Sequence, residues 1–310
     1  MSSKYVGRFA PTPSGPLHFG SIVAALGSYC DAKHHGGQWL LRFDDLDKQR
    51  TNAAHASHIL RTLEKYGLHW DLEPVYQTRR TQLYREWIEK LQESGASYPC
   101  SCTRKEIKER VKEIANGHRY DNFCRDKSQI KKPRSYRVRL PAPCVSTIYD
   151  SAKGKISEDL AKTSGDFIIY YSKDLPAYHL ASVVDDQEMN ITHVVRGDDL
   201  LRSSIRQAHL QEILSLNTTI YLHLPLAMSE SGRKLSKQNH AEPVKTINAG
   251  ETLIRALHFM GQDVTNIKDF MKVEEIVASA IKNWSRKPIG SSTMGAICGT
   301  TSHSTQNQDQ

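Results

Sequence analysis

The chain has 310 residues, of which 38% are hydrophobic and 25% are charged, with 42 Lys or Arg against 34 Asp or Glu. This balance predicts a folded globular chain of one large α/β domain or two to three smaller units. The opening residues, MSSKYVGRF, lack the apolar core of a signal peptide and no run of 18 apolar residues occurs, so we expect no membrane span and a cytoplasmic location.

Residues 5–21, YVGRFAPTPSGPLHFGS, predict a strand at 5–10, a loop rich in Pro and Gly, and a helix over about 21–33. A helix N-terminus after such a loop offers free backbone N–H groups and the positive end of the helix dipole, which suits a phosphate. Gly20 would let a ligand approach the backbone closely. The residues also fit an ordinary strand-to-helix loop, and neither of the phosphate motifs GxxxxGKS/T and GxGxxG occurs in them.

The next segment continues an alternation of strands and helices. Residues 38–45, QWLLRFDD, have the continuous apolar centre of a buried parallel strand, and residues 51–66 and 79–94 carry apolar side chains at helical spacing. Connections of this length predict a parallel sheet with right-handed βαβ units, and residues 1–98 form its first half.

The pattern breaks after residue 98, and residues 99–164 are predicted to be an insertion with a basic helix at 103–115 and a short strand at 135–140. Residues 104–139 contain 13 Lys or Arg against five Asp or Glu, an excess equal to the net charge of +8 of the whole chain. Clustered positive charge indicates a polyanion partner, most simply nucleic acid. A solvated, lysine-rich helix surface is the alternative.

Three of the six cysteines, Cys100, Cys102 and Cys124, fall within 25 residues of this insertion. In a cytosolic chain such clustering favours a metal over disulfides. A structural zinc ion takes four tetrahedral ligands, and chemistry alone would choose His118 as the fourth. The alternative is three reduced, partly buried thiols.

The second half of the sheet domain is expected over residues 165–245. Its predicted elements are apolar runs at 166–171, 180–185 and 192–196, a helix at 203–214 and a strand at 221–228. Residues 246–287 are expected to form short helices, and residues 288–310 lack the apolar content to order themselves and predict a disordered tail.

Charged residues occupy the carboxyl ends of three predicted strands, and such positions face the ligand crevice of a parallel sheet. Arg8 ends the first strand, Asp44 the second, and Arg196 the strand at 192–196. Two arginines and one carboxylate complement an amino acid with two carboxylates and one ammonium, which is glutamate or aspartate. Tyr178 could add a hydroxyl. The alternative is that Arg196 forms local ion pairs with the two aspartates that follow it.

The loop KLSKQ at 234–238 carries two lysines three apart, which suits a segment that closes on polyphosphate. Together with HFGS at 18–21 it resembles the HIGH and KMSKS signatures of class I aminoacyl-tRNA synthetases. The stretches RFAPTPSGPLHFGS, LRFDDLD, GDFIIYYSKDLPAYHLASVVDD and ITHVVRGDDLL resemble the glutamyl/glutaminyl branch of that class, over about residues 4–241. The cysteine cluster and the short remainder after residue 241 resemble the glutamyl-Q tRNA(Asp) synthetase family, which lacks an anticodon-binding domain.

This resemblance implies a Rossmann-like α/β catalytic domain with a zinc-binding insertion and a short helical C-terminal region. It implies an ATP site, with Mg²⁺, at His18, Gly20, Ser21, Lys234, Ser236 and Lys237, of which His18 and Lys237 are catalytic. It implies a glutamate site at Arg8, Phe9, Ala10, Pro11, Thr12, Asp44, Tyr178 and Arg196. It implies one structural zinc on Cys100, Cys102, Tyr120 and Cys124, and so favours Tyr120 over His118. Asp44 departs from the family, which usually has Glu there, and Gln238 replaces the final Ser of KMSKS.

The function implied is activation of L-glutamate with ATP in the absence of tRNA, followed by transfer to queuosine at the wobble position of tRNA(Asp). A monomer is expected. Two alternatives stay open: a shortened glutamyl-tRNA synthetase that charges a tRNA 3′ end, and a non-catalytic RNA-binding paralogue.

Overall fold

The computed structural model describes residues 4–111, 113–114, 117–127, 129–228, 242–268 and 270–291. Its centre is a parallel sheet in which β1 (Val6–Phe9) pairs with β2 (Gln38–Phe43), and β2 pairs with β3 (Val75–Tyr76). On the other side of β1 lies β12 (His193–Gly197), where the Thr192 N–H donates to the Val6 carbonyl at 2.9 Å. The predicted parallel sheet is therefore confirmed.

The sheet continues from β12 to β13 (Ile220–Leu224), with Arg196 opposite His223, and β13 bridges in parallel to β8 (Val145–Asp150). β8 forms an antiparallel hairpin with β9 (Gly154–Asp159), which is followed by the short helix α5 (Leu160–Thr163). This hairpin was not predicted from the sequence. Because β8 joins the central sheet, the predicted insertion at 99–164 is not structurally separate from that sheet.

The strands β1, β2, β12 and β13 each place side chains in two different cores. Trp39 and Leu41 of β2 pack with α1 and the C-terminal helices, whereas Leu40 packs with the helices on the opposite face. This two-sided burial explains the continuous apolar run that marked the strand in the sequence. The helices of this domain are α1 (Phe19–His34), α2 (Ala53–Lys65), α3 (Thr81–Glu93), α6 (Tyr178–Glu188) and α7 (Leu201–Ile213).

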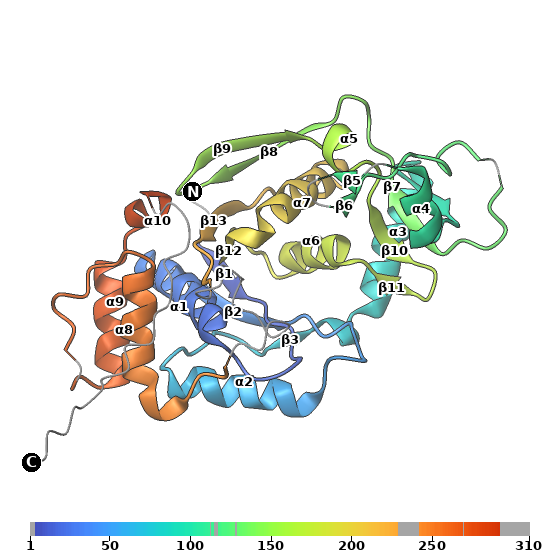
Figure 1. Cartoon of the computed structure of the whole chain (residues 1–310). Coiled ribbons are helices and arrows are strands. Elements are labelled where there is room, and N and C mark those ends of the chain that lie inside the picture. Colours follow the sequence, from blue (N-terminus) through green and yellow to red (C-terminus); the bar gives the residue numbers. More distant parts are fainter. Residues whose placement is uncertain are drawn as a thin grey trace, which may run out of the picture.

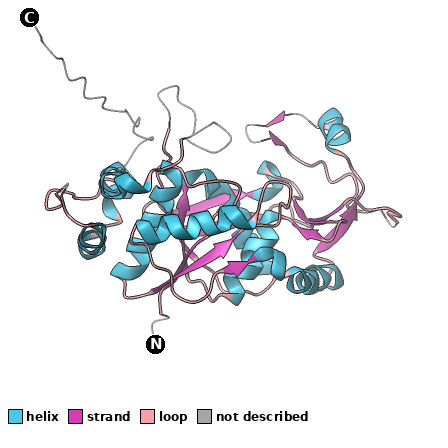
Figure 2. Cartoon of the chain, turned by 90° about the horizontal axis from the view of Figure 1, so that it is seen from below, coloured by secondary structure: helices cyan, strands magenta, loops and turns pink. Residues whose placement is uncertain are grey.

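A second, antiparallel sheet lies at the end of the molecule away from α8 and α9 (Figures 1 and 2). Its strands run in the order β11-β10-β7-β4, with bounds β4 (Ser97–Cys100), β7 (Ser135–Val138), β10 (Ile168–Tyr171) and β11 (Leu175–Pro176). The expectation that the parallel pattern resumes at 166–171 is thus wrong, because β10 pairs antiparallel with β7. The run at 180–185 lies inside the helix α6.

The basic segment is shorter as a helix than predicted. α4 (Arg104–Arg110) begins at a capping box, in which the Thr103 side chain accepts from the Glu106 N–H and the Glu106 carboxylate accepts from Thr103. The helix ends where Val111 becomes extended, and the two-stranded β5 (Glu113–Ile114) and β6 (Gly117–His118) follow.

The C-terminal helices α8 (Ala249–Phe259) and α9 (Val273–Asn283) pack beside α1 (Figure 1). α10 (Lys287–Ser291) follows, and its Ile289 is buried in the same core. The predicted tail therefore does not begin at residue 288, because this side chain anchors the helix. Residues 292–310 lie outside the described residues. Short 3₁₀ turns occur at η1 (Gln77–Arg79), η2 (Asp198–Leu200) and η4 (Thr246–Asn248).

Candidate active site

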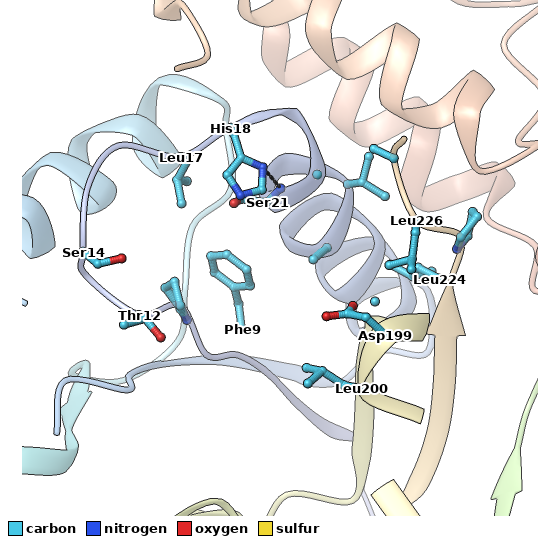
Figure 3. Close-up of a pocket in the computed structure, with 17 residues that line it drawn as sticks. Phe9, Thr12, Ser14, Leu17, His18, Ser21, Asp199, Leu200, Leu224 and Leu226 are labelled. Atoms are coloured by element: carbon cyan, nitrogen blue, oxygen red, sulfur yellow. Dashed lines mark hydrogen bonds between the residues drawn. The ribbon is translucent and has the colours of Figure 1, made fainter. Parts of the chain in front are cut away.

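A cleft of ≈ 280 Å³ opens where β1, β12 and β13 end and α1 begins. Figure 3 shows His18 at its rim, Phe9 and Thr12 on one side, and Asp199 and Leu200 on the other. Of the predicted ATP residues, His18, Gly20 and Ser21 line it, as do Phe9, Pro11 and Thr12 from the predicted glutamate residues. The cleft therefore joins the carboxyl ends of parallel strands to a helix N-terminus, which is the place where such folds bind phosphates.

His18 is the N-cap of α1, and this position fixes its ring. Its Nδ1 accepts a hydrogen bond from the Ser21 N–H at 3.3 Å, and its carbonyl accepts from Ser21 and Ile22. The imidazole is thus held at the positive end of a 16-residue helix, where the helix dipole favours an anion. This geometry fits both interpretations of the sequence, an ordinary strand-to-helix loop and a phosphate-binding turn.

The lysine loop lies outside the described residues, since Lys234, Ser236 and Lys237 fall within 229–241. The chain on both sides of that gap lies at the cleft. Before the gap, Ala227 lines the cleft; after it, Pro243 forms an isolated bridge with His18, and the Val244 N–H donates to the Leu17 carbonyl at 3.0 Å.

A second cleft of ≈ 890 Å³ shares Thr12 with the first. Asp44 and Tyr178 line it, together with residues of the loop after β2. Tyr178 is the first residue of α6 and is 40% exposed, so its ring is available to a ligand. The two clefts thus meet at Thr12, so the nucleotide and amino-acid sites that the sequence predicts would be neighbours.

Arg8 and Arg196 lie on the adjacent strands β1 and β12 and are 3% and 5% exposed. Arg196 donates through Nη1 to the Tyr178 hydroxyl at 3.2 Å, which joins two of the predicted glutamate residues directly. The alternative prediction was that Arg196 forms ion pairs with the two aspartates that follow it. Of these, Asp198 forms an ion pair with Lys153. Ala10 continues from β1 and is half-buried, and like Arg8 and Arg196 it is absent from the residues that line the two clefts.

A buried ionic network beneath these residues was missed in the sequence. Asp186 accepts from Arg8 Nε at 3.1 Å and from Arg42 Nη1 at 2.6 Å, and Arg42 Nε donates to Asp44 at 2.8 Å. Burial opposes ionisation of Asp186, but the two guanidinium groups hold its pKa below the ordinary value. Asp186 therefore connects Arg8, which is predicted to bind a carboxylate, through Arg42 to Asp44, which is predicted to bind the ammonium.

Two signals in the sequence could have revealed the missed residues. An arginine inside the apolar run QWLLRF must be paired when the strand is buried, and the pair DD inside the helix VVDD offers the partners. Gly197 was also missed: a Cβ there would lie 2.7 Å from Asp199 Oδ1, so a side chain would intrude on the wall of the first cleft.

The three clustered cysteines converge in the insertion, with their Sγ atoms all within 4.8 Å of one another. The Tyr120 hydroxyl lies 3.4 Å from Cys100 Sγ and 3.6 Å from Cys102 Sγ, and Cys102 and Cys124 Sγ are 3.5 Å apart. Although burial opposes it, hydrogen bonds from Tyr120 and the Ser101 backbone lower the pKa of Cys124 to about 7. The cluster could hold a metal ion. The side chain of His118 lies outside the described residues.

Among the described residues, the helices are all too short or too polar to cross a membrane. Residues 4–292 match the family model of tRNA synthetases class I (E and Q), catalytic domain. The chain therefore belongs to the glutamyl/glutaminyl branch of the class I aminoacyl-tRNA synthetases, and it is an enzyme of the ligase class.

Curated relatives assign the chain to one family within this branch. The glutamyl-Q tRNA(Asp) synthetase of Escherichia coli O6:H1 is 44% identical over 281 residues, which cover 90% of this chain and 89% of the relative. The protein of the same name from Vibrio parahaemolyticus is 44% identical over 282 residues, which cover 91% and 93%. The chain is thus a member of the glutamyl-Q tRNA(Asp) synthetase family, as its motifs predicted.

The comparison with a solved structure supports only the assignment of the fold. The glutamate-tRNA synthetase of Elizabethkingia anophelis superposes with a TM-score of 0.79 at 24% identity, over 96% of this chain and 68% of that chain. The chain thus has the fold of a class I synthetase catalytic domain, with a parallel sheet and helices.

Proposed function

We propose that the chain activates L-glutamate with ATP in the absence of tRNA and transfers the glutamyl group to queuosine at the wobble position of tRNA(Asp). The observation that carries this proposal is the set of relatives named glutamyl-Q tRNA(Asp) synthetase, which are 41–44% identical over about 90% of the chain. The pair of arginines beside a helix N-terminus supports it, because it complements a dicarboxylic amino acid next to a triphosphate.

In the activation step, one oxygen of the glutamate α-carboxylate attacks the α-phosphorus of ATP and pyrophosphate leaves, which forms glutamyl-adenylate. The protein supplies positioning and charge neutralisation rather than covalent chemistry. Arg8 and Arg196 hold the carboxylates, Asp44 the ammonium and Tyr178 a polar contact, with Phe9 to Thr12 beside them. Asp44 reaches less far than a glutamate would, so either a bridging water or a shift of the backbone would bring it to the ammonium.

The triphosphate, with Mg²⁺, lies over the N-terminus of α1. His18 and the first-turn residues Gly20 and Ser21 hold it, and Lys234, Ser236 and Lys237 are its other proposed binding residues. Lys237 neutralises the departing pyrophosphate. In the second step a hydroxyl of the queuosine base attacks the glutamyl carbonyl and AMP leaves.

We propose that the cysteine cluster holds one structural zinc ion. With Zn–S bonds of about 2.3 Å, tetrahedral ligands lie roughly 3.8 Å apart. Three separations in the cluster, Cys100 to the Tyr120 hydroxyl, Cys102 to the same hydroxyl and Cys102 to Cys124, are 3.4 to 3.6 Å, and all the Sγ atoms lie within 4.8 Å of one another, which fits that geometry. Tyr120 is thus the proposed fourth ligand. The ion would tie β4 to the loop before β7 and takes no part in the chemistry.

Metal analysis tests this zinc site. Freshly purified protein is expected to contain about one zinc per chain, and Cys124→Ala is expected to lose most of it, since a structural site needs all its ligands. Cys144→Ala is the matched control, because Cys144 is also buried but lies outside the cluster. Tyr120→Phe should weaken zinc retention and His118→Ala should not; the reverse order would assign the fourth ligand to His118.

The proposed tRNA surface is the basic insertion, residues 99–164, which lies between the two halves of the catalytic domain in the chain, 1–98 and 165–245. Arg104 and Lys108 support it, because both line a cleft of ≈ 610 Å³ that also contains Tyr178 of the amino-acid site. Residues 246–287 pack beside α1 as a helical support. We infer a monomer that works in the cytoplasm, where ATP and tRNA are available.

Glutamylation of tRNA(Asp) with and without queuosine tests the function. Labelled glutamate should appear only on queuosine-containing tRNA, in a nuclease fragment that carries the anticodon. Label at the 3′ end would identify a shortened glutamyl-tRNA synthetase. Absence of both label and glutamate-dependent ATP–pyrophosphate exchange would identify a non-catalytic RNA-binding paralogue.

A further inference from the structure

A buried chain of hydrogen bonds leads from the β8–β9 hairpin to Arg196. Asp150 Oδ2 lies 2.7 Å from His223 Nδ1, and His223 Nε2 lies 2.7 Å from Ser204 Oγ. Ser204 Oγ in turn accepts from Arg196 Nη2 at 2.7 Å. Three elements meet in this chain, since Asp150 ends β8, His223 lies on β13 and Ser204 on α7. All four side chains are buried.

The donor and the acceptor of each hydrogen bond from Asp150 to Arg196 can be assigned. Asp150 also accepts from the backbone N–H groups of His223, Ala152 and Lys153, so its carboxylate cannot turn away. Burial lowers the pKa of His223, which keeps the ring neutral with its proton on Nδ1 toward the carboxylate. His223 Nε2 then accepts from the Ser204 hydroxyl at 2.7 Å, a shorter contact than the 3.2 Å from that hydroxyl to the Leu200 carbonyl, and the Ser204 oxygen accepts from the Arg196 guanidinium.

Aspartate, histidine and serine in this order also form the catalytic triad of hydrolases. That role is excluded here, because Ser204 is 0% exposed and its oxygen is already bonded to Arg196. No substrate carbonyl can reach it. The hydrogen bonds lead instead to Arg196, which donates to the hydroxyl of Tyr178 at the second cleft.

We propose that Asp150, His223 and Ser204 are positioning residues that orient Arg196 for a carboxylate of the amino-acid substrate. This inference rests on the proposed function. Gln207 Oε1 holds the same Nη2 at 2.7 Å, and the Tyr178 hydroxyl accepts from Nη1. The Nε–H of Arg196 is buried and has no hydrogen-bond partner in the part of the chain that the structure describes, so a substrate carboxylate would supply its acceptor.

The test is the kinetics of glutamate-dependent ATP–pyrophosphate exchange. Ser204→Ala is expected to raise the KM for glutamate about tenfold, as loss of one hydrogen bond to a charged group does. The KM for ATP should change less than about twofold, since His18 and the start of α1 are untouched. Ser182→Ala is the matched control: Ser182 is a buried helical serine whose hydroxyl makes no hydrogen bond within the described residues. It should leave both KM values unchanged.

Asp150→Asn provides the second variant, because Asp150 contacts the arginine only through His223 and Ser204. It is expected to raise the KM for glutamate as well, and the double variant Asp150→Asn with Ser204→Ala should be no worse than Ser204→Ala alone. Additive effects, equal rises in the KM for ATP, or an equal effect of Ser182→Ala would each overturn the positioning role. Absence of exchange in the unaltered protein would instead overturn the proposed function, and this inference with it.

Discussion

Lys237→Ala is expected to slow glutamate-dependent ATP–pyrophosphate exchange by about a hundredfold. Phosphoryl chemistry of this kind depends on neutralising charge as the pyrophosphate leaves, and removal of one such contact costs on the order of 3 kcal/mol of transition-state stabilisation. The residues on either side of the lysine loop support this role, because Ala227 lines the cleft at the start of α1 and Pro243 bridges to His18. The effect should fall mainly on kcat, since the charge develops in the transition state.

Lys245→Ala is the control for this experiment. Lys245 follows the same loop and is exposed. Its backbone carbonyl accepts a hydrogen bond from Tyr66, so the substitution of its side chain keeps this contact. Its substitution removes one positive charge near the cleft but should leave exchange within about twofold, as expected for a screened surface charge. Near-normal exchange in Lys237→Ala, or an equal loss in Lys245→Ala, would refute the assignment to Lys237.

Much of the parallel sheet, with the strand-to-helix turn at its edge, could be predicted because the signals are local. The apolar run at β2, the strand-to-helix turn before α1 and the arginines at two strand ends are all read from neighbouring residues. The antiparallel position of β10 was missed because its pairing depends on β7, some 30 residues earlier in the chain. A short apolar run has the same pattern in either type of sheet.

The interactions behind the site could not be predicted for a related reason. Asp186 meets Arg8 across a sequence separation of 178 residues, and His223 meets Asp150 across 73. Sequence indicates that a buried arginine such as Arg42 needs a partner, but it does not say which of many aspartates the fold brings there. These partners decide whether the predicted binding residues are held rigidly or are free to turn.

Asp186→Ala is therefore expected to destabilise the fold by about 3–5 kcal/mol, because it leaves Arg8 and Arg42 buried without their shared counter-ion. Asp198→Ala is the control, since its pair with Lys153 is partly exposed and should contribute about 0–1 kcal/mol. Urea unfolding at pH 7 measures both.

The pH dependence of the same experiment separates loss of the ion pair from loss of packing. The folded-state pKa of Asp186 is held below its ordinary value, so the pair stabilises the fold above pH about 4 and this contribution is lost as pH falls through the lowered pKa. The difference in free energy of unfolding between the unaltered protein and Asp186→Ala should thus shrink toward acid pH. A difference that is constant with pH, or no larger than that of Asp198→Ala, would mean that Asp186 acts as a packed side chain and does not hold the two arginines by its charge.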